Sequence, residues 1–362
     1  MGRARGPAQP DLLGPKSLLR RLARRWRDPI IILPYLTYGT AQKLTVCGRV
    51  LEDEGFLPAA DADTRWQNLV RFYKRLESDE VPGARLRARH LGVETQGVTD
   101  DEGYFRLELA PRGRVGPGQW QEVELELIET PSAKATANVL VPSKRARFGV
   151  ISDIDDTIVS SHVPHKLRMI LTVALSNART RKPFLGVAAF YRALHAGVNP
   201  FFYVSKSPWN LYAPLVEYLE GQGLPLGPLM LRDFGFSSNR NHKTEAIEDI
   251  LDTYPKLKFI LIGDSGEEDP EIYSGIVQRF PDRIRAIYIR SVNPKRINEI
   301  EKLADQVAKT GCQLVLAPEA EPAATHAAAE GLIQASELRA VRAEKDSEMS
   351  SSKPAVSSGA LK

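Results

Sequence analysis

The pattern of hydrophobic and polar positions changes once along this chain, close to residue 147. Before that point, apolar and polar residues alternate along short segments separated by turn signals, which is typical of half-buried β-strands. The expected strands span residues 44–51, 84–90, 104–109, 120–128 and 135–141. Several short strands at this spacing predict a small antiparallel β-sandwich over residues 29–146.

Residues 63–80 interrupt the predicted strands with a different period. Apolar and aromatic side chains recur there at helical spacing, at Trp66, Leu69, Val70, Tyr73 and Leu76. This period predicts an amphipathic helix inserted into the β region. Packing of its aromatic side against the sandwich is the preferred interpretation, and the alternative is a surface for a partner or a membrane.

From residue 147 onward, short apolar runs alternate with longer segments of helical period. The expected strands are 148–152, 198–204, 228–231, 257–262, 284–289 and 312–316. The expected helices are 164–177, 187–195, 211–222, 244–254 and 295–310. This alternation predicts an α/β fold over residues 147–317, a Rossmann-like three-layer arrangement with a parallel sheet and helices on both faces.

The two ends of the chain differ in composition from the regions between them. Residues 1–28 are rich in arginine, and residues 17–26 have the pattern of a short basic amphipathic helix capped by Ser17. Such a helix binds membrane surfaces, while the alternatives are a flexible basic arm or a helix packed on the next domain. Residues 318–362 are rich in Ala, Glu, Ser and Pro. They predict a mostly disordered tail, with helical character over residues 327–345.

Composition narrows the class of protein. The 362 residues carry a net charge of only +4, so there is no overall signature of a polyanion-binding protein, and no nucleic-acid partner is expected. The two cysteines, Cys47 and Cys312, indicate neither a disulfide framework nor a zinc cluster. No apolar run is long enough to span a membrane. We therefore expect a cytoplasmic protein, with peripheral contact to the inner membrane face through residues 17–27 if the basic helix forms.

The candidate chemistry begins directly after the first strand of the α/β region. Asp153, Asp155 and Asp156 place three carboxylates in four residues, followed by Thr157. Carboxylates this close repel one another and are poorly placed in a core, so a bound cation would explain them. Magnesium prefers such oxygen ligands, and a carboxylate can also attack phosphorus. The alternative is an acidic turn with Thr157 capping a helix, but ligands of open α/β sheets bind at this end of the strands.

Two further polar residues follow at later strand and helix ends. Ser205 comes at the end of the run FFYVS, where its hydroxyl can donate to a phosphate oxygen. The alternative is a helix N-cap, and Ser207 competes for either role. Lys243 lies at a predicted helix start, where a cation is unfavourable unless an anion is held nearby. A solvated surface lysine is the alternative there.

The last candidate segment is an acidic loop after the strand 257–262. It reads GDSGEEDPEIY and contains Asp264 and Asp269. These carboxylates are candidate ligands for a cation. The alternative is an acidic loop that caps a helix, because Asp269-Pro270 is a favourable helix opening.

The segment Asp153-Ile-Asp155-Asp156-Thr157 resembles the DxDxT signature of haloacid dehalogenase-like phosphatases. The resemblance implies that Asp153 is a nucleophile and that Asp155 is a general acid/base, whereas Asp156 lies at a variable position. It also implies a magnesium site with the ligands Asp153, Asp155 (through its carbonyl), Asp264 and Asp269. The substrate phosphate would be held by Thr157, Ser205 and Lys243.

A narrower resemblance rests on four segments together: SDIDDTI, YVSKSPWNLY, RDFG…HK and IGDSGEEDPEIY. They look like the catalytic domain of the actin-patch-type phosphatidate phosphatases and their bacterial relatives, over about residues 147–317. This resemblance implies magnesium-dependent removal of phosphate from phosphatidate, which yields diacylglycerol. Residues 164–177 would then form either a lipid-facing cap or a core helix.

Two other functions remain open at this point. The same chemistry can act on a soluble phosphomonoester, a nucleic-acid end or a phosphoprotein. A different class of protein would use the basic N-terminal segment and the β region to bind membranes or partners, with an idle catalytic fold. The presence of all five residues of the candidate site argues against an idle fold: Asp153, Asp155, Lys243, Asp264 and Asp269.

Overall fold

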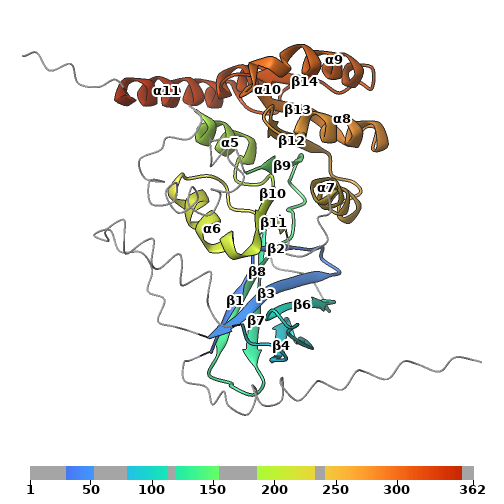
Figure 1. Cartoon of the computed structure of the whole chain (residues 1–362), viewed down its shortest axis with the longest axis vertical. Helices are drawn as coiled ribbons and strands as arrows, with labels where there is room; N and C mark the ends of the chain where they lie inside the picture. Colours follow the sequence, from blue (N-terminus) through green and yellow to red (C-terminus); the bar gives the residue numbers. More distant parts are fainter. Residues whose placement is uncertain (1–29, 53–79, 113–118, 155–185, 233–240, 353–362) are drawn as a thin grey trace, which may run out of the picture.

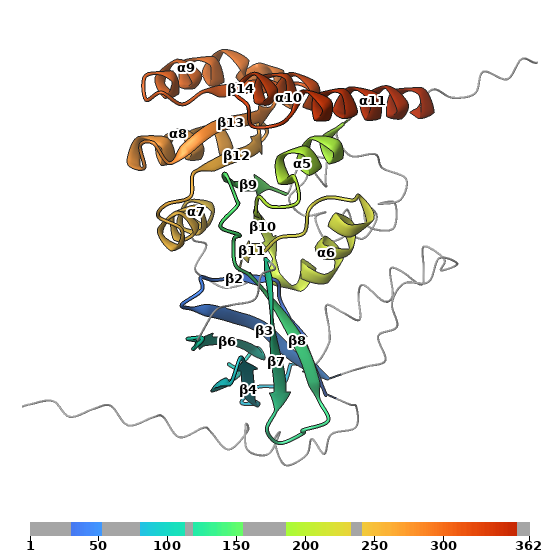
Figure 2. The same ribbon diagram turned by 180° about the vertical axis from the view of Figure 1, so that it is seen from behind.

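The computed structural model of the chain describes residues 30–52, 80–112, 119–154, 186–232 and 241–352. Two parts are visible, a β part and a larger α/β part stacked on it (Figure 1), and the view from behind shows the same arrangement (Figure 2). The predicted segments 1–28, 164–177 and all but the last residue of 63–80 lie outside the described residues. No helix among the described residues is long and apolar enough to cross a membrane.

The β part consists of two sheets that share one core. The first sheet has the order β1-β3-β6 and the second β2-β8-β7-β4-β5, with antiparallel neighbours except for the parallel pair β2–β8. The strands are β1 (Ile30–Pro34), β2 (Thr37–Tyr38), β3 (Leu44–Glu52), β4 (Arg85–His90), β5 (Val93–Val98), β6 (Tyr104–Leu109), β7 (Trp120–Leu127) and β8 (Lys134–Leu140).

Alternation along these strands explains the shared core. Successive side chains of a strand point to opposite faces, so every second residue of β3, β6 and β7 turns inward. Val46 and Leu107 from one sheet meet Leu86, Val123 and Val139 from the other, and all five are buried. The five strands expected before residue 147 are present within a residue or two of their predicted ends, whereas β1, β2 and β5 were not predicted.

The α/β part contains a six-stranded parallel sheet with the order β11-β10-β9-β12-β13-β14. Its strands are β9 (Gly149–Asp153), β10 (Phe201–Pro208), β11 (Leu229–Arg232), β12 (Phe259–Asp264), β13 (Ile284–Arg290) and β14 (Leu314–Ala317). In chain order this is 3-2-1-4-5-6, the order of a doubly wound sheet. The direction of winding reverses at β9, so β9 lies between β10 and β12.

Helices cover both faces of the parallel sheet, as the alternating pattern predicted. Buried side chains of α5, α6 and α10 form one apolar cluster with the sheet, and those of α7, α8 and α9 form another on the opposite face. The helices are α5 (Val187–His195), α6 (Tyr212–Gly221), α7 (His242–Thr253), α8 (Asp269–Arg279), α9 (Ile297–Ala308) and α10 (Ala320–Ala329). Two short 3-10 turns, η2 (Trp209–Leu211) and η3 (Pro294–Arg296), precede α6 and α9.

The C-terminal segment is more ordered than its composition predicted. Helix α10 and the longer α11 (Ala335–Ser352) occupy most of the predicted tail. The helical character predicted for residues 327–345 is largely present, whereas the prediction of disorder is wrong for residues 320–326 and 346–352. The physical reason is a stripe of small residues: Ala320, Ala324 and Ala327 are buried against the sheet. Val341 of α11 is also fully buried. Residues 353–362 lie outside the described part.

The β part is packed directly on the α/β part through aromatic side chains. The ring of Tyr35 stacks on Trp209 with centroids 4.7 Å apart. The backbone N–H of Leu36 donates to the hydroxyl of Tyr212 at 2.6 Å, and the Tyr254 hydroxyl donates to the carbonyl of Gly39 at 2.9 Å. The segment between β1 and β3 therefore contacts both faces of the parallel sheet, through α6 and α7. The predicted domain boundary at residues 146 and 147 falls between β8 and β9.

Candidate metal and phosphate site

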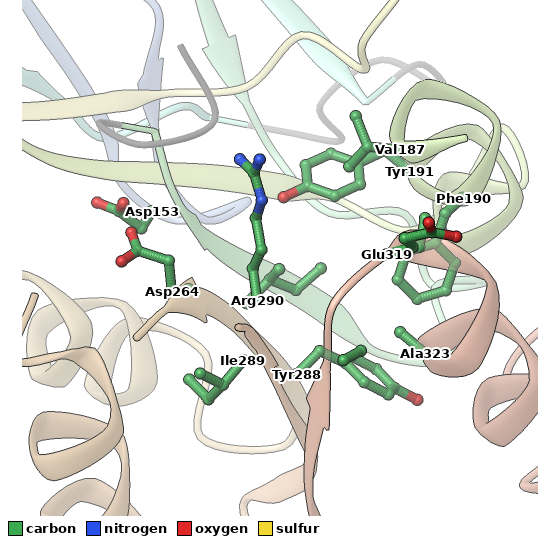
Figure 3. A pocket seen from close by; sticks show the side chains of 14 residues that line it. Asp153, Val187, Phe190, Tyr191, Asp264, Tyr288, Ile289, Arg290, Glu319 and Ala323 are labelled. Atoms are coloured by element: carbon green, nitrogen blue, oxygen red, sulfur yellow. The ribbon is translucent and has the colours of Figure 1, made fainter. Parts of the chain in front are cut away.

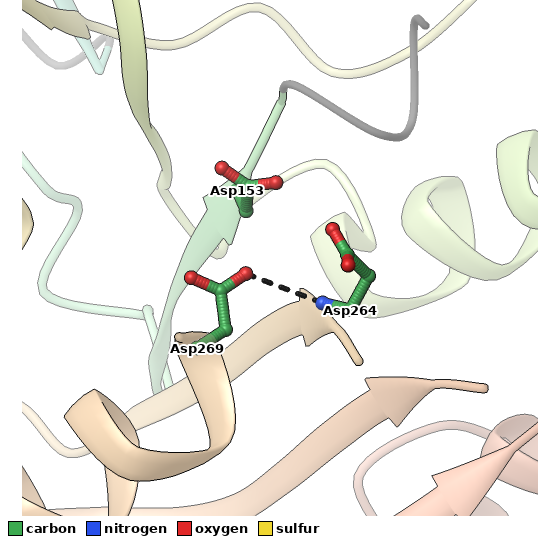
Figure 4. A group of neighbouring side chains, drawn as sticks. All are labelled: Asp153, Asp264 and Asp269. Carbon is green, nitrogen blue, oxygen red and sulfur yellow. Dashed lines mark hydrogen bonds between the residues drawn. The ribbon is translucent and has the colours of Figure 1, made fainter. Parts of the chain in front are cut away.

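Three buried carboxylates converge at the carboxyl end of the parallel sheet. Asp153 is the last residue of β9, Asp264 is the last residue of the neighbouring β12, and Asp269 is the first residue of α8. One oxygen from each lies within 4.8 Å of the others. Figure 4 shows the three side chains gathered around one space. The backbone N–H of Asp264 donates to Asp269 Oδ2 at 3.2 Å, which holds the start of α8 against the strand. The site thus lies where the winding of the sheet reverses, the usual ligand position of this fold.

The residue before Asp264 must be a glycine for this geometry to form. A Cβ atom built at Gly263 would lie 2.8 Å from Cγ of Asp269, closer than real side chains allow. Glycine lets α8 approach the end of β12. The hydroxyl of Tyr273 adds a second tie, because it donates to the carbonyl of Ile262 at 2.9 Å. In the sequence motif, Gly263 is therefore needed for packing, and Asp264 provides the carboxylate.

Lys243 enters the cluster from α7, where it is the second residue of the helix. Its Nζ atom lies 2.7 Å from Asp153 Oδ1, 2.7 Å from Asp269 Oδ1 and 3.1 Å from Glu267 Oε2. Its side chain is only 2% exposed. Burial by itself lowers the pKa of this ammonium, but Asp153 and Asp269 outweigh burial and raise the pKa well above its ordinary value. Lys243 is therefore a permanent cation inside the site.

The site nevertheless has an excess of negative charge. Burial raises the pKa of Asp269 to about 6, against the lowering effect of Lys243. One ammonium cannot neutralise three buried carboxylates, and uncompensated charge in a buried site is costly. A divalent cation with a preference for oxygen ligands would remove this cost. The residues Asp153, Asp264 and Asp269 fit such an ion by their number, charge and closeness.

The acidic loop between β12 and α8 is fastened on both sides. Asp264 Oδ1 accepts hydrogen bonds from the backbone N–H groups of Gly266 and Glu267. Ser265 Oγ accepts from the N–H groups of Val292 and Asn293, each at 2.9 Å. The guanidinium of Arg296 also donates to two backbone carbonyls of this loop. The loop therefore presents its carboxylates from a well-connected backbone, as a preformed binding site requires.

Ser205 lies beside Asp153 on the neighbouring strand, although not at the end of that strand. Val204 of β10 pairs in register with Asp153, so Ser205 is one residue beyond that level. Strand β10 continues to Pro208, whereas the sequence predicted its end at residue 204. The side chain of Ser205 is buried, and its Oγ accepts a hydrogen bond from the backbone N–H of Ser207 at 2.9 Å. The structure thus brings Ser205 to the same sheet edge as the carboxylates.

Not every predicted residue can be placed. Asp155, Asp156 and Thr157 lie outside the described residues. The sequence analysis also missed Glu267, which contacts Lys243 and Lys206 at 3.1 Å each. Glu267 belongs to the acidic run GEED, which the sequence shows plainly. The run contains three adjacent carboxylates, and nothing in the sequence indicates which of them contacts a lysine.

A mostly apolar pocket adjoins the carboxylates. Asp153, Asp264 and Arg290 stand at its charged side, and it extends between α5, β13 and α10 (Figure 3). Its apolar wall includes Val187, Phe190, Tyr191, Tyr288, Ile289 and Ala323. The Tyr191 hydroxyl is 2.8 Å from Ser152 Oγ, which connects α5 with the strand that carries Asp153. The pocket offers an apolar group a place next to the charged site.

The fold and the charged site together are typical of an α/β enzyme that acts on an anionic group, and comparison with known proteins narrows this class. Residues 148–291 match the family model described as the catalytic domain of phosphatidate phosphatase APP1. The match confirms the resemblance found from the sequence motifs. It covers all of the described candidate residues, from Asp153 to Asp269.

Two curated proteins are similar to part of this chain. Phosphatidate phosphatase APP1 of Saccharomyces cerevisiae is 39% identical over 152 residues, which are 40% of this chain and 26% of the yeast protein. An uncharacterized protein of Schizosaccharomyces pombe is 29% identical over 214 residues, which are 55% of this chain and 35% of that protein. The chain therefore matches about a quarter to a third of the length of these relatives.

Among solved structures, a carbohydrate acetylesterase from Xanthomonas citri is 13% identical, with 77% of this chain and 75% of that chain covered. Its TM-score is 0.27, which is too low to support an argument about fold or function.

Proposed function

We propose that this protein is a magnesium-dependent phosphatase that removes phosphate from phosphatidate and yields diacylglycerol. The observation that carries the proposal is the contact of Lys243 with Asp153 and Asp269, at 2.7 Å each, inside a region similar to a phosphatidate phosphatase catalytic domain. A buried lysine among carboxylates can neutralise a phosphate that binds next to them. The excess of acidic groups around it supports a metal ion.

In the proposed reaction, a carboxylate oxygen of Asp153 attacks phosphorus, and the bond between phosphorus and the ester oxygen breaks. Asp155 gives its proton to the leaving oxygen, so that the alcohol departs neutral. A water molecule then attacks the phosphorus of the aspartyl-phosphate and transfers a proton to Asp155. Inorganic phosphate leaves and the Asp153 carboxylate is restored. The role of Asp155 rests on its place in the DxDxT signature.

The other residues hold charge in place. Asp153, Asp264, Asp269 and the carbonyl of Asp155 would hold magnesium, which supplies positive charge for the non-bridging phosphate oxygens when it is bound. Lys243 supplies a second positive charge next to Asp153 and Asp269. Ser205 and Thr157 would donate hydrogen bonds to the phosphate. Because Asp153, Asp264 and Lys243 are fixed by the strand ends and by α7, these three side chains need little reorganisation during the reaction.

Two observations support a lipid as the substrate. The matched family model bears the name of a phosphatidate phosphatase. A small pocket beside Asp153, lined mostly by aliphatic and aromatic side chains and also by Glu319, can take a small apolar portion of the leaving group. Membrane contact through residues 17–27 would bring the site to such a substrate.

The direct test measures release of inorganic phosphate from phosphatidate in mixed micelles, with magnesium and with a chelator. Asp153→Asn is compared with Asp305→Asn, a matched change at an exposed aspartate of α9. We expect magnesium-dependent release that disappears in the Asp153 variant and persists in the control. A panel of soluble phosphomonoesters runs in parallel, and activity on these alone would discard the lipid while retaining the site. Full activity of Asp153→Asn would contradict the proposal.

A further inference from the structure

Glu267 shares one carboxylate oxygen between two lysines that differ in environment. Its Oε2 atom lies 3.1 Å from Nζ of Lys243 and 3.1 Å from Nζ of Lys206. The side chain of Lys243 is 2% exposed, whereas that of Lys206 is 37% exposed. Glu267 therefore stands between an inner cation, which contacts Asp153 and Asp269, and an outer cation at the surface of the site.

The position of Lys206 follows from the course of β10. Val204 is level with Asp153, and Ser205 and Ser207 on either side of Lys206 are buried. Side chains alternate along a strand, so the lysine points to the other side from its two serine neighbours. The pairing of β10 with β11 is irregular between Val204 and Pro208. This places an ammonium beside the carboxyl end of the sheet, next to the proposed phosphate-binding Ser205.

The balance of charges in the site indicates that a bound phosphate needs a further cation, which Lys206 can provide. Asp153, Asp264, Asp269, Glu267 and Glu268 bring five negative charges, and Lys243, Lys206 and Arg290 bring three positive charges. A divalent cation would make the sum zero, and a doubly charged phosphate would then make it negative again. A cation with a mobile side chain can approach the bound phosphate and neutralise part of its negative charge.

We propose that Lys206 is a substrate-binding residue that leaves Glu267 to contact a non-bridging oxygen of a doubly charged phosphomonoester. A lysine suits this role because its ammonium is a compact charge with three donors on a flexible stem. Lys243 is held by three carboxylates and stays in place, while Lys206 is half-exposed and reaches the incoming group. Lys206 thereby favours phosphomonoesters over neutral esters at the same site. This inference rests on the proposed phosphatase function.

The test compares Lys206→Met, Lys206→Arg and Lys302→Met, the last a matched change at an exposed lysine of α9. Loss of a charge-assisted hydrogen bond to phosphate raises KM about tenfold in Lys206→Met, with kcat within about twofold. Lys206→Arg recovers most of the wild-type KM, and Lys302→Met leaves it unchanged. Competitive inhibition by inorganic phosphate weakens in parallel with KM. An unchanged KM in Lys206→Met would overturn the proposal.

A second measurement separates substrate binding from a role in holding the acidic loop. Magnesium affinity and melting temperature stay near the wild-type values in Lys206→Met if the lysine acts on substrate. If it only neutralises Glu267, the melting temperature falls and the magnesium affinity rises, because a cation beside the carboxylates has been removed. Calorimetry with inorganic phosphate and the magnesium-loaded protein needs no turnover. If the wild type is inactive on every ester, the proposed phosphatase function is wrong. Phosphate binding that weakens in Lys206→Met would still support Lys206 as a phosphate-binding residue. Equal phosphate affinity in both proteins, or none in either, would refute it.

Discussion

Two clusters of ion pairs in this molecule use similar residues in opposite environments. On the second sheet of the β part, Arg89 contacts Glu94 at 2.8 Å, with side chains that are 47% and 39% exposed, and Arg87 and Lys134 contact Glu126. In the α/β part, Lys243 contacts Asp153 and Asp269 at 2.7 Å with all three side chains buried. Exposed pairs contribute little to stability because water and salt screen them, whereas buried charges are costly unless they are matched.

The two clusters differ in how well their positive and negative charges match. The cross-strand pairs of the β part have cations and carboxylates facing each other in register, as in the pair Arg87–Glu126. The buried cluster has more carboxylates than cations and would destabilise the fold if left without a bound ion. An arrangement that costs stability in the absence of a ligand indicates a binding site. The following predictions test this difference between the two clusters.

The largest effect is expected from Lys243→Met. The substitution leaves three buried carboxylates without their ammonium, and removal of one partner of a buried ion pair costs about 3–5 kcal/mol. We expect a clear drop in the free energy of unfolding, measured by chemical denaturation without metal. Lys302→Met, at an exposed position of α9, serves as the control and should match the wild type. Stability equal to the wild type in the Lys243 variant would mean that its carboxylates are already protonated.

Magnesium should stabilise the wild-type protein by binding to the folded state. At a concentration a hundred times the dissociation constant, this linkage contributes about 2.7 kcal/mol. Asp264→Asn removes one proposed ligand and relieves repulsion among the carboxylates, so the variant should be at least as stable without metal and respond much less to magnesium. Thermal denaturation with and without magnesium measures both effects. An undiminished response in Asp264→Asn would place the ion elsewhere.

The affinity for magnesium should depend on pH. Burial raises the pKa of Asp269 to about 6, and a carboxyl group must lose its proton before it binds a metal ion. Protons therefore compete with magnesium below about pH 6, where the affinity falls by up to about tenfold for each pH unit, and the affinity levels off above that pH. Titration calorimetry between pH 5 and 8 measures the profile. An affinity that increases toward low pH would contradict this assignment.

The smallest effect is expected on the exposed sheet of the β part. Glu126 contacts Arg87, Arg89 and Lys134, all at 3.6 Å or more. Glu126→Gln should leave the melting temperature almost unchanged, because partly exposed ion pairs at such distances contribute little. Its activity should equal that of the wild type. A large loss of stability would show that this cluster is energetically coupled, and the contrast with the buried site would disappear.

The fold could be predicted well where the pattern is local. Alternation along β3, β6 and β7 and the apolar runs of β9 and β12 reflect burial of one or both faces, which each segment displays by itself. Helix α10 was mostly missed because it is built from alanines. Alanine is apolar enough to be buried but gives a weak hydrophobic signal, so its burial against the sheet depends on the shape of the neighbouring surface.

The sequence by itself determined which residues stand at the ends of strands and helices, because those ends follow from local apolar runs and from the residues that terminate them. Asp153, Lys243, Asp264 and Asp269 could be selected on that basis. Only the tertiary structure decided that β9 and β12 are neighbours, that Gly263 makes room for Asp269, and that Glu267 connects Lys243 with Lys206. These relations depend on packing between segments that are distant in the chain, and no local pattern records which distant side chain will fill a given space.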